Sequence, residues 1–278
     1  MIGVLRGVVS RPGGGVGGVI VLMVLVAAVA APVVATHDPD ALDILHRFAG
    51  PSVGHWLGTD QLGRDLYSRM VFGARVAMAV ALSSILMALV LGVLAGVLAA
   101  LAGGVWEAAA LVVFDIIASF PSLVLALAAV AVLGPSTPLV VAVVAVALLP
   151  QFGRVARAQV LLLREAPFIT AERLLGASTA RIVGSHVLPG IAGPLVVLAS
   201  IEVPVVITIE AGLSFIGLGV RLPLASWGTL INDGYSYLSD SKVPVIVAST
   251  ALGLATLGFT LFGEALRDAA DPRGRGRR

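Results

Sequence analysis

The chain has 278 residues, of which 58% are hydrophobic and only 12% are charged, and its formal net charge is +2. With a mean hydropathy of +1.04, this composition excludes a soluble globular domain and indicates an integral membrane protein. The chain contains no cysteine, which excludes a disulfide framework and a thiolate metal site.

Six apolar segments are long enough to cross the hydrocarbon core of a bilayer, which takes about 20 helical residues. They cover residues 16–35, 76–102, 108–133, 138–160, 190–212 and 243–263. The first has basic residues before it, as a signal peptide does, but its apolar run exceeds the roughly 7–15 residues of a cleaved leader. We therefore expect an all-α, polytopic membrane protein with six transmembrane helices, the first of them retained.

Basic residues are distributed unevenly among the segments between these spans. With the N-terminus inside, twelve arginines fall in the inner segments and six basic residues fall outside. The positive-inside rule therefore predicts that both termini are cytoplasmic. The predicted organisation is a cytoplasmic tail at 1–15, a first helix at 16–35, an external segment at 36–75, a core at 76–266 with a cytoplasmic loop at 164–189, and a basic cytoplasmic tail at 267–278. We interpret this last tail as a topology anchor and expect no nucleic-acid partner.

The stretch FITAERLLGASTARIVGSHVLPGIAG, residues 168–193, is unusually polar for this chain. Pro167 suits the first turn of a helix, Gly176 can adopt the left-handed conformation that follows a helix, and Ser178 is a good N-cap. We expect a short helix at 167–175, a sharp turn at Gly176, and a second short helix that runs until Pro189 opens the fifth span.

The sequence lacks the signatures of catalysis and of nucleotide binding. It has no H-E-x-x-H and no G-x-S-x-G, and its only lysine, Lys242, does not follow a glycine as a phosphate-binding P-loop requires. A match to G-x-G-x-x-G at Gly13, Gly15 and Gly18 has no strand before it and leads into a membrane span, so we interpret it as accidental. We expect no catalytic residue, no metal ligand and no cofactor in this chain.

Three histidines and three aspartates lie close together in the external segment, namely His37, His46, His55, Asp38, Asp40 and Asp43. Such residues can form a metal site. We favour the interpretation that they are solvated loop residues.

Ionisable residues within a membrane span are costly and usually face a bundle interior or a water-filled path. The candidates are Asp115, Glu202 and Glu210. Asp115 is expected near the cytoplasmic end of the third span, where it can extend to the interface. For Glu202, near the middle of the fifth span, a pathway role and a buried hydrogen bond are equally open.

Three further stretches resemble one family. They are HWLGTDQLGRDLYSRMVFGARVAMAV at 55–80, EAGLSFIGLGVRLPLASWGTLI at 210–231 and LFGEALRDAADPR at 261–273. They resemble the C-type inner-membrane permease subunit of dipeptide and oligopeptide ABC importers, which implies the six-helix type I permease fold. The residues that carry the external signatures are Gly58, Thr59, Asp60, Gly63, Arg64, Asp65 and Trp227.

The polar stretch is similar to the loop by which such permeases dock onto a separate ATPase. The family pattern is E-A-A, three residues, glycine, nine residues, then I-x-L-P. Gly176, Leu188 and Pro189 match it, whereas Thr170, Ala171 and Glu172 replace E-A-A and His186 replaces the isoleucine. The coupling residues that this resemblance implies are Thr170, Ala171, Glu172, Arg173, Gly176, Ala177, Ser178, His186, Leu188 and Pro189.

The resemblance implies a set of partners in a bacterial cytoplasmic (inner) membrane. They are a homologous second permease chain, one or two cytoplasmic ATPase chains that hold ATP and magnesium, an extracytoplasmic peptide-binding protein, and membrane lipid. The same architecture is similar to permeases for nickel chelates, glutathione and antimicrobial peptides, and these substrates stay open.

Two function classes of another kind are disfavoured by the residues. A membrane hydrolase needs a nucleophile and a base within reach, yet the histidines fall in loops. A self-contained channel or secondary carrier needs its own gate and coupling-ion sites, for which the intramembrane charges are too few.

Overall fold

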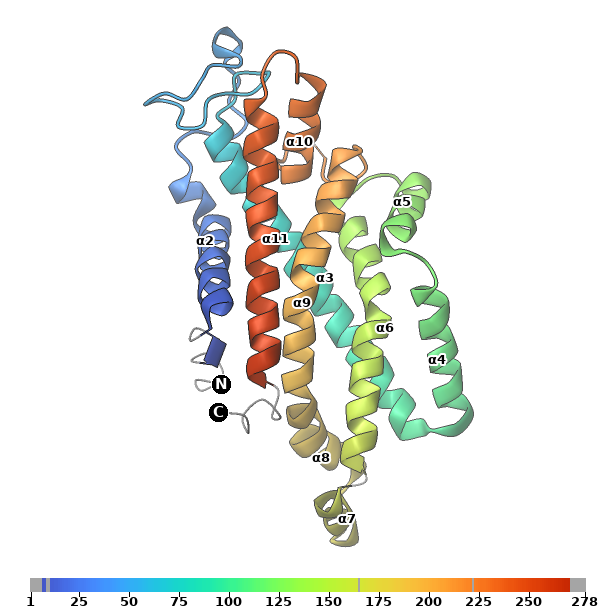
Figure 1. Ribbon diagram of the computed structural model, residues 1–278. Coiled ribbons are helices and arrows are strands. Elements are labelled where there is room, and N and C mark those ends of the chain that lie inside the picture. The colour runs from blue at the N-terminus through green and yellow to red at the C-terminus, as the bar shows by residue number, and fades with distance from the viewer. Residues whose placement is uncertain (1–6, 9–10, 165, 222, 271–278) are drawn as a thin grey trace.

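The computed structural model describes residues 7–8, 11–164, 166–221 and 223–270, and this part of the chain is almost entirely helical (Figure 1). The outer parts of both predicted tails lie outside the described residues. Within the described residues, five segments are long and apolar enough to cross a membrane. They are α2 (Pro12–Val34), α3 (Leu66–Ala102), α6 (Thr137–Arg164), a π-helical turn η2 (Val183–Val187) continuing into α9 (Leu188–Phe215), and α11 (Val243–Ala270). The predicted all-α membrane architecture is confirmed.

The third predicted span is broken. Helices α4 (Gly104–Ala118) and α5 (Ser122–Leu133) are bent by 81° relative to each other, so the prediction of one continuous helix at 108–133 is wrong. The break falls at Pro121, whose ring disfavours a helical conformation at Phe120 and whose ψ of 129° is extended. Each helix is shorter than the roughly 20 residues of a full span, so six spans are reached only if the pair counts as one.

Helix α3 is the longest element and begins ten residues earlier than predicted. Its 37 residues correspond to a length of about 55 Å, more than a bilayer core requires. It runs diagonally behind the other helices and lies beside α6 (Figure 1). The approach is close, because a Cβ atom on Gly96 would collide with the backbone of Gly153. Small residues of this kind let membrane helices pack tightly.

The glycine-rich run at 13–18 lies inside α2 and packs against α11. A Cβ atom on Gly17 would lie 2.7 Å from the backbone nitrogen of Phe262, so only glycine fits there. Arg11 forms an ion pair with Asp268 at 3.0 Å. The start of α2 and the end of α11 therefore lie at the same end of the bundle.

Two groups of short elements lie at opposite ends of this bundle (Figure 1). Helices α7 (Pro167–Leu174) and α8 (Thr179–Ile182) lie at the end where α2 begins. Helix α10 (Trp227–Ser236), the 3-10 turn η1 (Ile44–His46) and the loop 35–65 lie at the other end.

Candidate functional site

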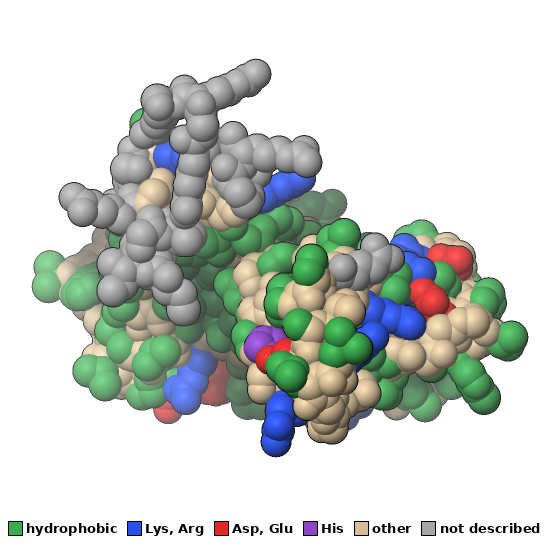
Figure 2. All heavy atoms as spheres, turned by 90° about the horizontal axis from the view of Figure 1, so that it is seen from below, with side chains coloured by type: hydrophobic (Ala, Val, Ile, Leu, Met, Phe, Trp, Pro, Cys, Tyr) green, Lys and Arg blue, Asp and Glu red, His purple; other side chains and the backbone are tan. Residues whose placement is uncertain are grey.

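The first candidate site is the α7–α8 hairpin, residues 167–189, which lies at one end of the bundle. Pro167 occupies the first turn of α7, as predicted. Ile169 is only 1% exposed and belongs to the hydrophobic core, whereas Leu174 and Leu175 are 84% and 87% exposed. Figure 2 shows hydrophobic and basic side chains together on this end of the molecule. One side of α7 is therefore anchored to the bundle while another presents apolar surface.

The hairpin turns at Gly176, which has a φ of +83°. The backbone N–H of Gly176 donates to the carbonyl of Arg173, and the N–H of Ala177 donates to the carbonyl of Glu172, both at 3.0 Å. These two bonds form a Schellman motif, which ends a helix on a left-handed residue. The left-handed conformation predicted for Gly176 is thus present in the structure.

The second arm of the hairpin begins as predicted and ends differently. Ser178 caps α8 through a hydrogen bond from the N–H of Arg181 to its Oγ at 3.4 Å. The chain then passes through the π-helical turn η2 into α9 without a break, with the N–H of Leu188 donating to the carbonyl of Val183. Pro189 has no N–H to donate to a carbonyl four residues earlier, and the wider turn before it accommodates that loss. The helix is therefore continuous where we expected Pro189 to separate two helices.

A polar contact joins the two arms of the hairpin. Nε2 of His186 lies 2.8 Å from Oε1 of Glu172, and both side chains are 33% exposed. The ring of Phe168 meets the imidazole edge-on, with centroids 5.8 Å apart. Glu172 and His186 are two of the positions at which the sequence departs from the family pattern, and the fold brings them into contact.

At the opposite end, a buried ionic network surrounds Asp60. Its Oδ2 atom lies 2.7 Å from Nε of Arg64 and 3.5 Å from Nε of Arg69. Arg64 also reaches Asp233 on α10 at 3.3 Å, and Arg69 reaches Asp40 at 3.4 Å. Asp60 and Arg69 are almost completely buried, so charge pairing is what makes their burial tolerable. We call Asp60, Arg64, Arg69, Asp40 and Asp233 the outer network.

The loop that carries this network is shaped by its own sequence. Oδ1 of Asp60 accepts hydrogen bonds from the backbone N–H groups of Leu62 and Arg64, each at 2.9 Å, which closes an Asx turn. Trp227, the other signature residue, is 2% exposed and donates from Nε1 to the carbonyl of Met70 at 3.0 Å. The external signatures at 58–65 and 227 are therefore both packed against the first turns of α3.

Asp65 caps the N-terminus of α3. Its Oδ2 atom accepts hydrogen bonds from the backbone N–H of Ser68 at 2.8 Å and from Oγ of Ser68 at 2.7 Å, while Oδ1 lies 2.9 Å from Nδ1 of His55. Burial raises the pKa of this carboxyl, but the hydrogen bonds from Ser68 and His55 outweigh burial and hold the pKa below its ordinary value. Asp65 is therefore a buried carboxylate at neutral pH.

The candidates at membrane depth have different surroundings. Asp115 on α4 forms an ion pair with Arg154 on α6 at 2.7 Å, and its extension to the interface stays a prediction. Glu210 is fully buried, and its Oε1 accepts a hydrogen bond from Oγ of Ser214 at 2.7 Å. Glu202 is 6% exposed within α9. Pathway roles for all three stay predictions.

A second ion pair joins α4 to α6, between Nε of Arg157 and Oε1 of Glu107 at 2.6 Å.

A pocket of about 540 Å³ lies between α9 and α11. Its polar lining includes Thr208, Thr256, Thr260 and Glu264. One side of the bundle therefore presents polar groups along two apolar helices.

Several residues that organise these sites were absent from the sequence candidates. Arg69, Asp233 and Arg154 each form an ion pair with a predicted residue, and the last two do so with partners 169 and 39 residues away in the chain. The sequence marks them only as charged residues within or beside apolar segments. Placing such a charge there costs free energy unless a partner of opposite charge lies nearby. A search for pairs of such charges would have marked them without assigning the partners.

Comparison with known proteins identifies the family. A family described as binding-protein-dependent transport system inner membrane component matches residues 88–276. The chain is 36% identical over 259 residues to a probable D,D-dipeptide transport system permease protein of Escherichia coli (strain K12), covering 93% of this chain and 87% of that protein. It is 35% identical to the dipeptide transport system permease protein of Alkalihalophilus pseudofirmus (strain ATCC BAA-2126 / JCM 17055 / OF4), covering 93% and 85% of the two chains. It is likewise 35% identical to a glutathione transport system permease protein of Escherichia coli O1:K1 / APEC, covering 92% and 85%. The chain therefore belongs to the family of inner-membrane components of binding-protein-dependent transport systems.

Proposed function

We propose that this chain is one permease subunit of an ATP-driven importer for short peptides. The observation that carries the proposal is the α7–α8 hairpin, which resembles the loop by which permeases of this family contact their ATPase. The relatives named above are permeases for dipeptides, D,D-dipeptides and glutathione, all of which contain peptide or peptide-like bonds. A short peptide is the cargo class that these names share.

In this proposal, ATP and magnesium bind to separate ATPase chains. The exposed apolar side chains of α7 and of the residue after it, namely Phe168, Leu174 and Leu175, supply the contact surface on this chain. Movement of the ATPase passes into the bundle because α7 follows α6 closely and α8 continues through η2 into α9. A rigid hairpin of this kind transmits a rigid-body displacement, which a flexible loop would absorb.

The hairpin end is cytoplasmic in this proposal, and the outer network faces the extracytoplasmic side. The excess of arginine near the hairpin end supports that orientation by the positive-inside rule. The loop 35–65 and α10 then form the surface that receives a peptide-binding protein. A homologous second permease chain completes the translocation path, for which the pocket between α9 and α11, lined by both apolar and polar residues, is the candidate half on this chain.

The experiment that tests the cargo class is uptake in a deletion strain complemented with this chain. Labelled di-, tri- and pentapeptides, labelled glutathione and a labelled nickel chelate are each offered singly, and unlabelled nickel chelate is added as a competitor of peptide uptake. We expect uptake of at least one peptide to depend on the chain and to resist competition by the nickel chelate. Restoration of nickel-chelate or glutathione uptake alone, with no peptide restored, would assign another cargo within the same importer class.

A further inference from the structure

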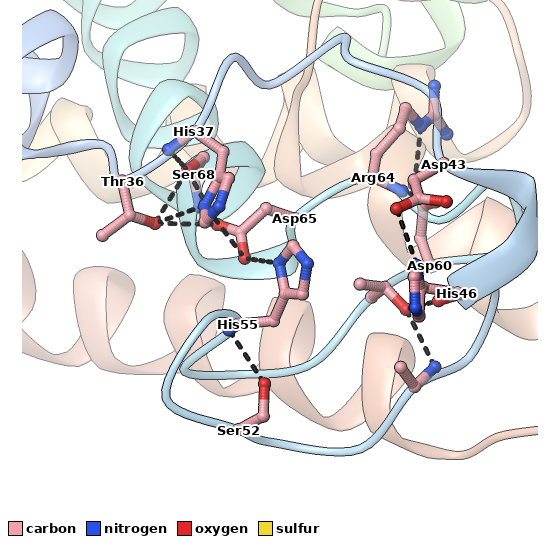
Figure 3. A network of polar contacts seen from close by, with 12 residues as sticks. Thr36, His37, Asp43, His46, Ser52, His55, Asp60, Arg64, Asp65 and Ser68 are labelled. Carbon is pink, nitrogen blue, oxygen red and sulfur yellow. Dashed lines mark hydrogen bonds and ion pairs between the residues drawn. The ribbon is translucent and has the colours of Figure 1, made fainter.

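Two histidines and a buried carboxylate meet at the outer end of the bundle, beside the outer network (Figure 3). Nδ1 of His55 lies 2.9 Å from Oδ1 of Asp65, and Nδ1 of His37 lies 3.9 Å from the same oxygen. One ligand atom from each of these three residues can be chosen so that all lie within 4.8 Å of one another. The two imidazole rings are tilted by 31° with centroids 4.7 Å apart.

This donor set suits a divalent transition metal and zinc in particular. Two imidazole nitrogens and one carboxylate oxygen are frequent zinc ligands, with metal–ligand distances of about 2.0–2.2 Å in a tetrahedron. Ligand atoms in such a site are about 3.3 Å apart, so small side-chain movements bring the observed atoms to that spacing. Harder cations such as magnesium and calcium prefer oxygen ligands throughout.

The carboxylate is held in place for this role by the fold. Ser68 fixes Oδ2 of Asp65 through its N–H and its hydroxyl, while Oδ1 faces the histidines. The backbone N–H of His37 donates to Oγ of Ser68 at 3.0 Å, and Oγ1 of Thr36 donates to Oδ2 of Asp65 at 3.3 Å. Outer contacts of this kind orient the ligands of metal sites.

We propose that His37, His55 and Asp65 bind one zinc ion, with a water or a partner's side chain at the fourth position. The three ligands come from separate segments: the residues after α2, the loop before α3, and the N-cap of α3. The ion fastens the end of the first span to the start of the second and stabilises the outer loop. This site lies outside the hairpin and stands independently of the cargo.

The same loop offers a matched control. His46 and Asp43 form a pair at 2.7 Å, but their side chains are 66% and 47% exposed and no third ligand completes the group among the described residues. Replacing His46 therefore removes an imidazole from the same loop without touching the proposed site. His37 is the better test position on the site itself, because its side chain is 41% exposed and its loss leaves the core intact.

The experiment measures zinc bound to the full chain, purified in detergent with a tag that lacks histidine. The chain is stripped with a chelator, reloaded with zinc chloride, and assayed by elemental analysis and by isothermal titration. We expect one zinc per chain, a thermal midpoint that rises on reloading, and loss of both effects in His37→Ala. In Ser68→Ala, we expect affinity to fall by roughly 10–100-fold, as for loss of an outer-shell contact.

His46→Ala should bind zinc like the parent chain. The proposal is overturned if the parent binds less than a stoichiometric amount, or if His37→Ala and His46→Ala lose the same amount. The proposal is also overturned if His55→Gln, which lacks the imidazole, binds zinc as tightly as the parent chain does. In those cases the contact of His55 with Asp65 is only a hydrogen bond that supports the N-cap.

Discussion

Glu172 and His186 contact each other across the α7–α8 hairpin, with Oε1 and Nε2 2.8 Å apart. Each residue occupies a position at which the chain departs from the family pattern, which has alanine and isoleucine there. The contact bridges the first arm of the hairpin and the π-helical turn that leads into α9. Two departures that look independent in the sequence thus form one contact, which lies on the path that we propose from the ATPase surface to a membrane helix.

We expect Glu172→Ala and His186→Ala to weaken ATPase docking individually and to be non-additive together. Because both side chains are partly exposed, the interaction energy should be about 0.2–1 kcal/mol, which corresponds to a change of a few-fold in affinity. Binding of the purified ATPase to the four members of the double-mutant cycle measures it. An additive cycle would mean that the contact does not help to hold the hairpin.

Substitution of Gly176 should disturb coupling more than folding. A side chain there meets no atom within 4 Å, so its cost comes from the left-handed backbone and should be about 1–2 kcal/mol. We expect Gly176→Val to insert and assemble normally while peptide-stimulated ATP hydrolysis falls, and Gly176→Ala to show a smaller loss.

Gly184 provides the control for this prediction. It also has open space around its Cβ position, but its φ is not positive, so Gly184→Ala should leave hydrolysis at the parent level. Equal effects of the two alanine substitutions would show that the hairpin is sensitive to any added side chain. The left-handed turn would then have no special role.

The outer network should be sensitive to the loss of its central carboxylate. Asp60→Asn leaves Arg64 and Arg69 buried with one negative charge fewer, and breaking a buried pair in this way costs about 3–5 kcal/mol. We expect a clear fall in the thermal midpoint of the detergent-purified chain and reduced peptide uptake. Asp240→Asn, on an exposed loop, should change neither quantity. Similar midpoints for the two variants would contradict a stabilising role for the network.

Because Asp115 and Arg154 form an ion pair, the effect of replacing one of them on membrane abundance should depend on whether the other is present. Arg154→Gln leaves an unpaired carboxylate on the apolar helix α4, which is unfavourable within a membrane span. The double variant Asp115→Asn with Arg154→Gln removes both charges and should accumulate in the membrane better than Arg154→Gln alone. Membrane abundance by quantitative immunoblot decides this, and an equal or lower level of the double variant would count against pairing.

Features that depend on a few neighbouring residues could be predicted from the sequence. The start of α7 at Pro167, the turn at Gly176 and the cap at Ser178 each follow from local backbone preferences, and the structure contains all three. The apolar spans could also be predicted, because the hydropathy of a segment depends only on the residues within it. Their roles in docking and transport stay predictions.

Features that depend on packing could not be predicted in the same way. The break at Pro121 was missed because a hydropathy window averages over the proline and finds an apolar run on both sides. Asp115 and Arg154 are 39 residues apart, so their pairing requires knowledge of how α4 lies on α6. The early start of α3 at Leu66 is not predicted because its first turns carry Arg69 and Arg75, which interrupt the apolar run.

The central claim is that this chain supplies the membrane path while separate ATPase chains supply the energy. The most direct measurement compares ATP hydrolysis and ATP-dependent uptake of a labelled dipeptide in proteoliposomes that contain the chain alone or with its second permease, ATPase and binding-protein partners. We predict that the chain alone neither binds ATP, nor hydrolyses it, nor accumulates peptide, and that both activities appear with the full set of partners. Hydrolysis by the isolated, ATPase-free chain, or peptide accumulation that needs no ATPase, would contradict the account.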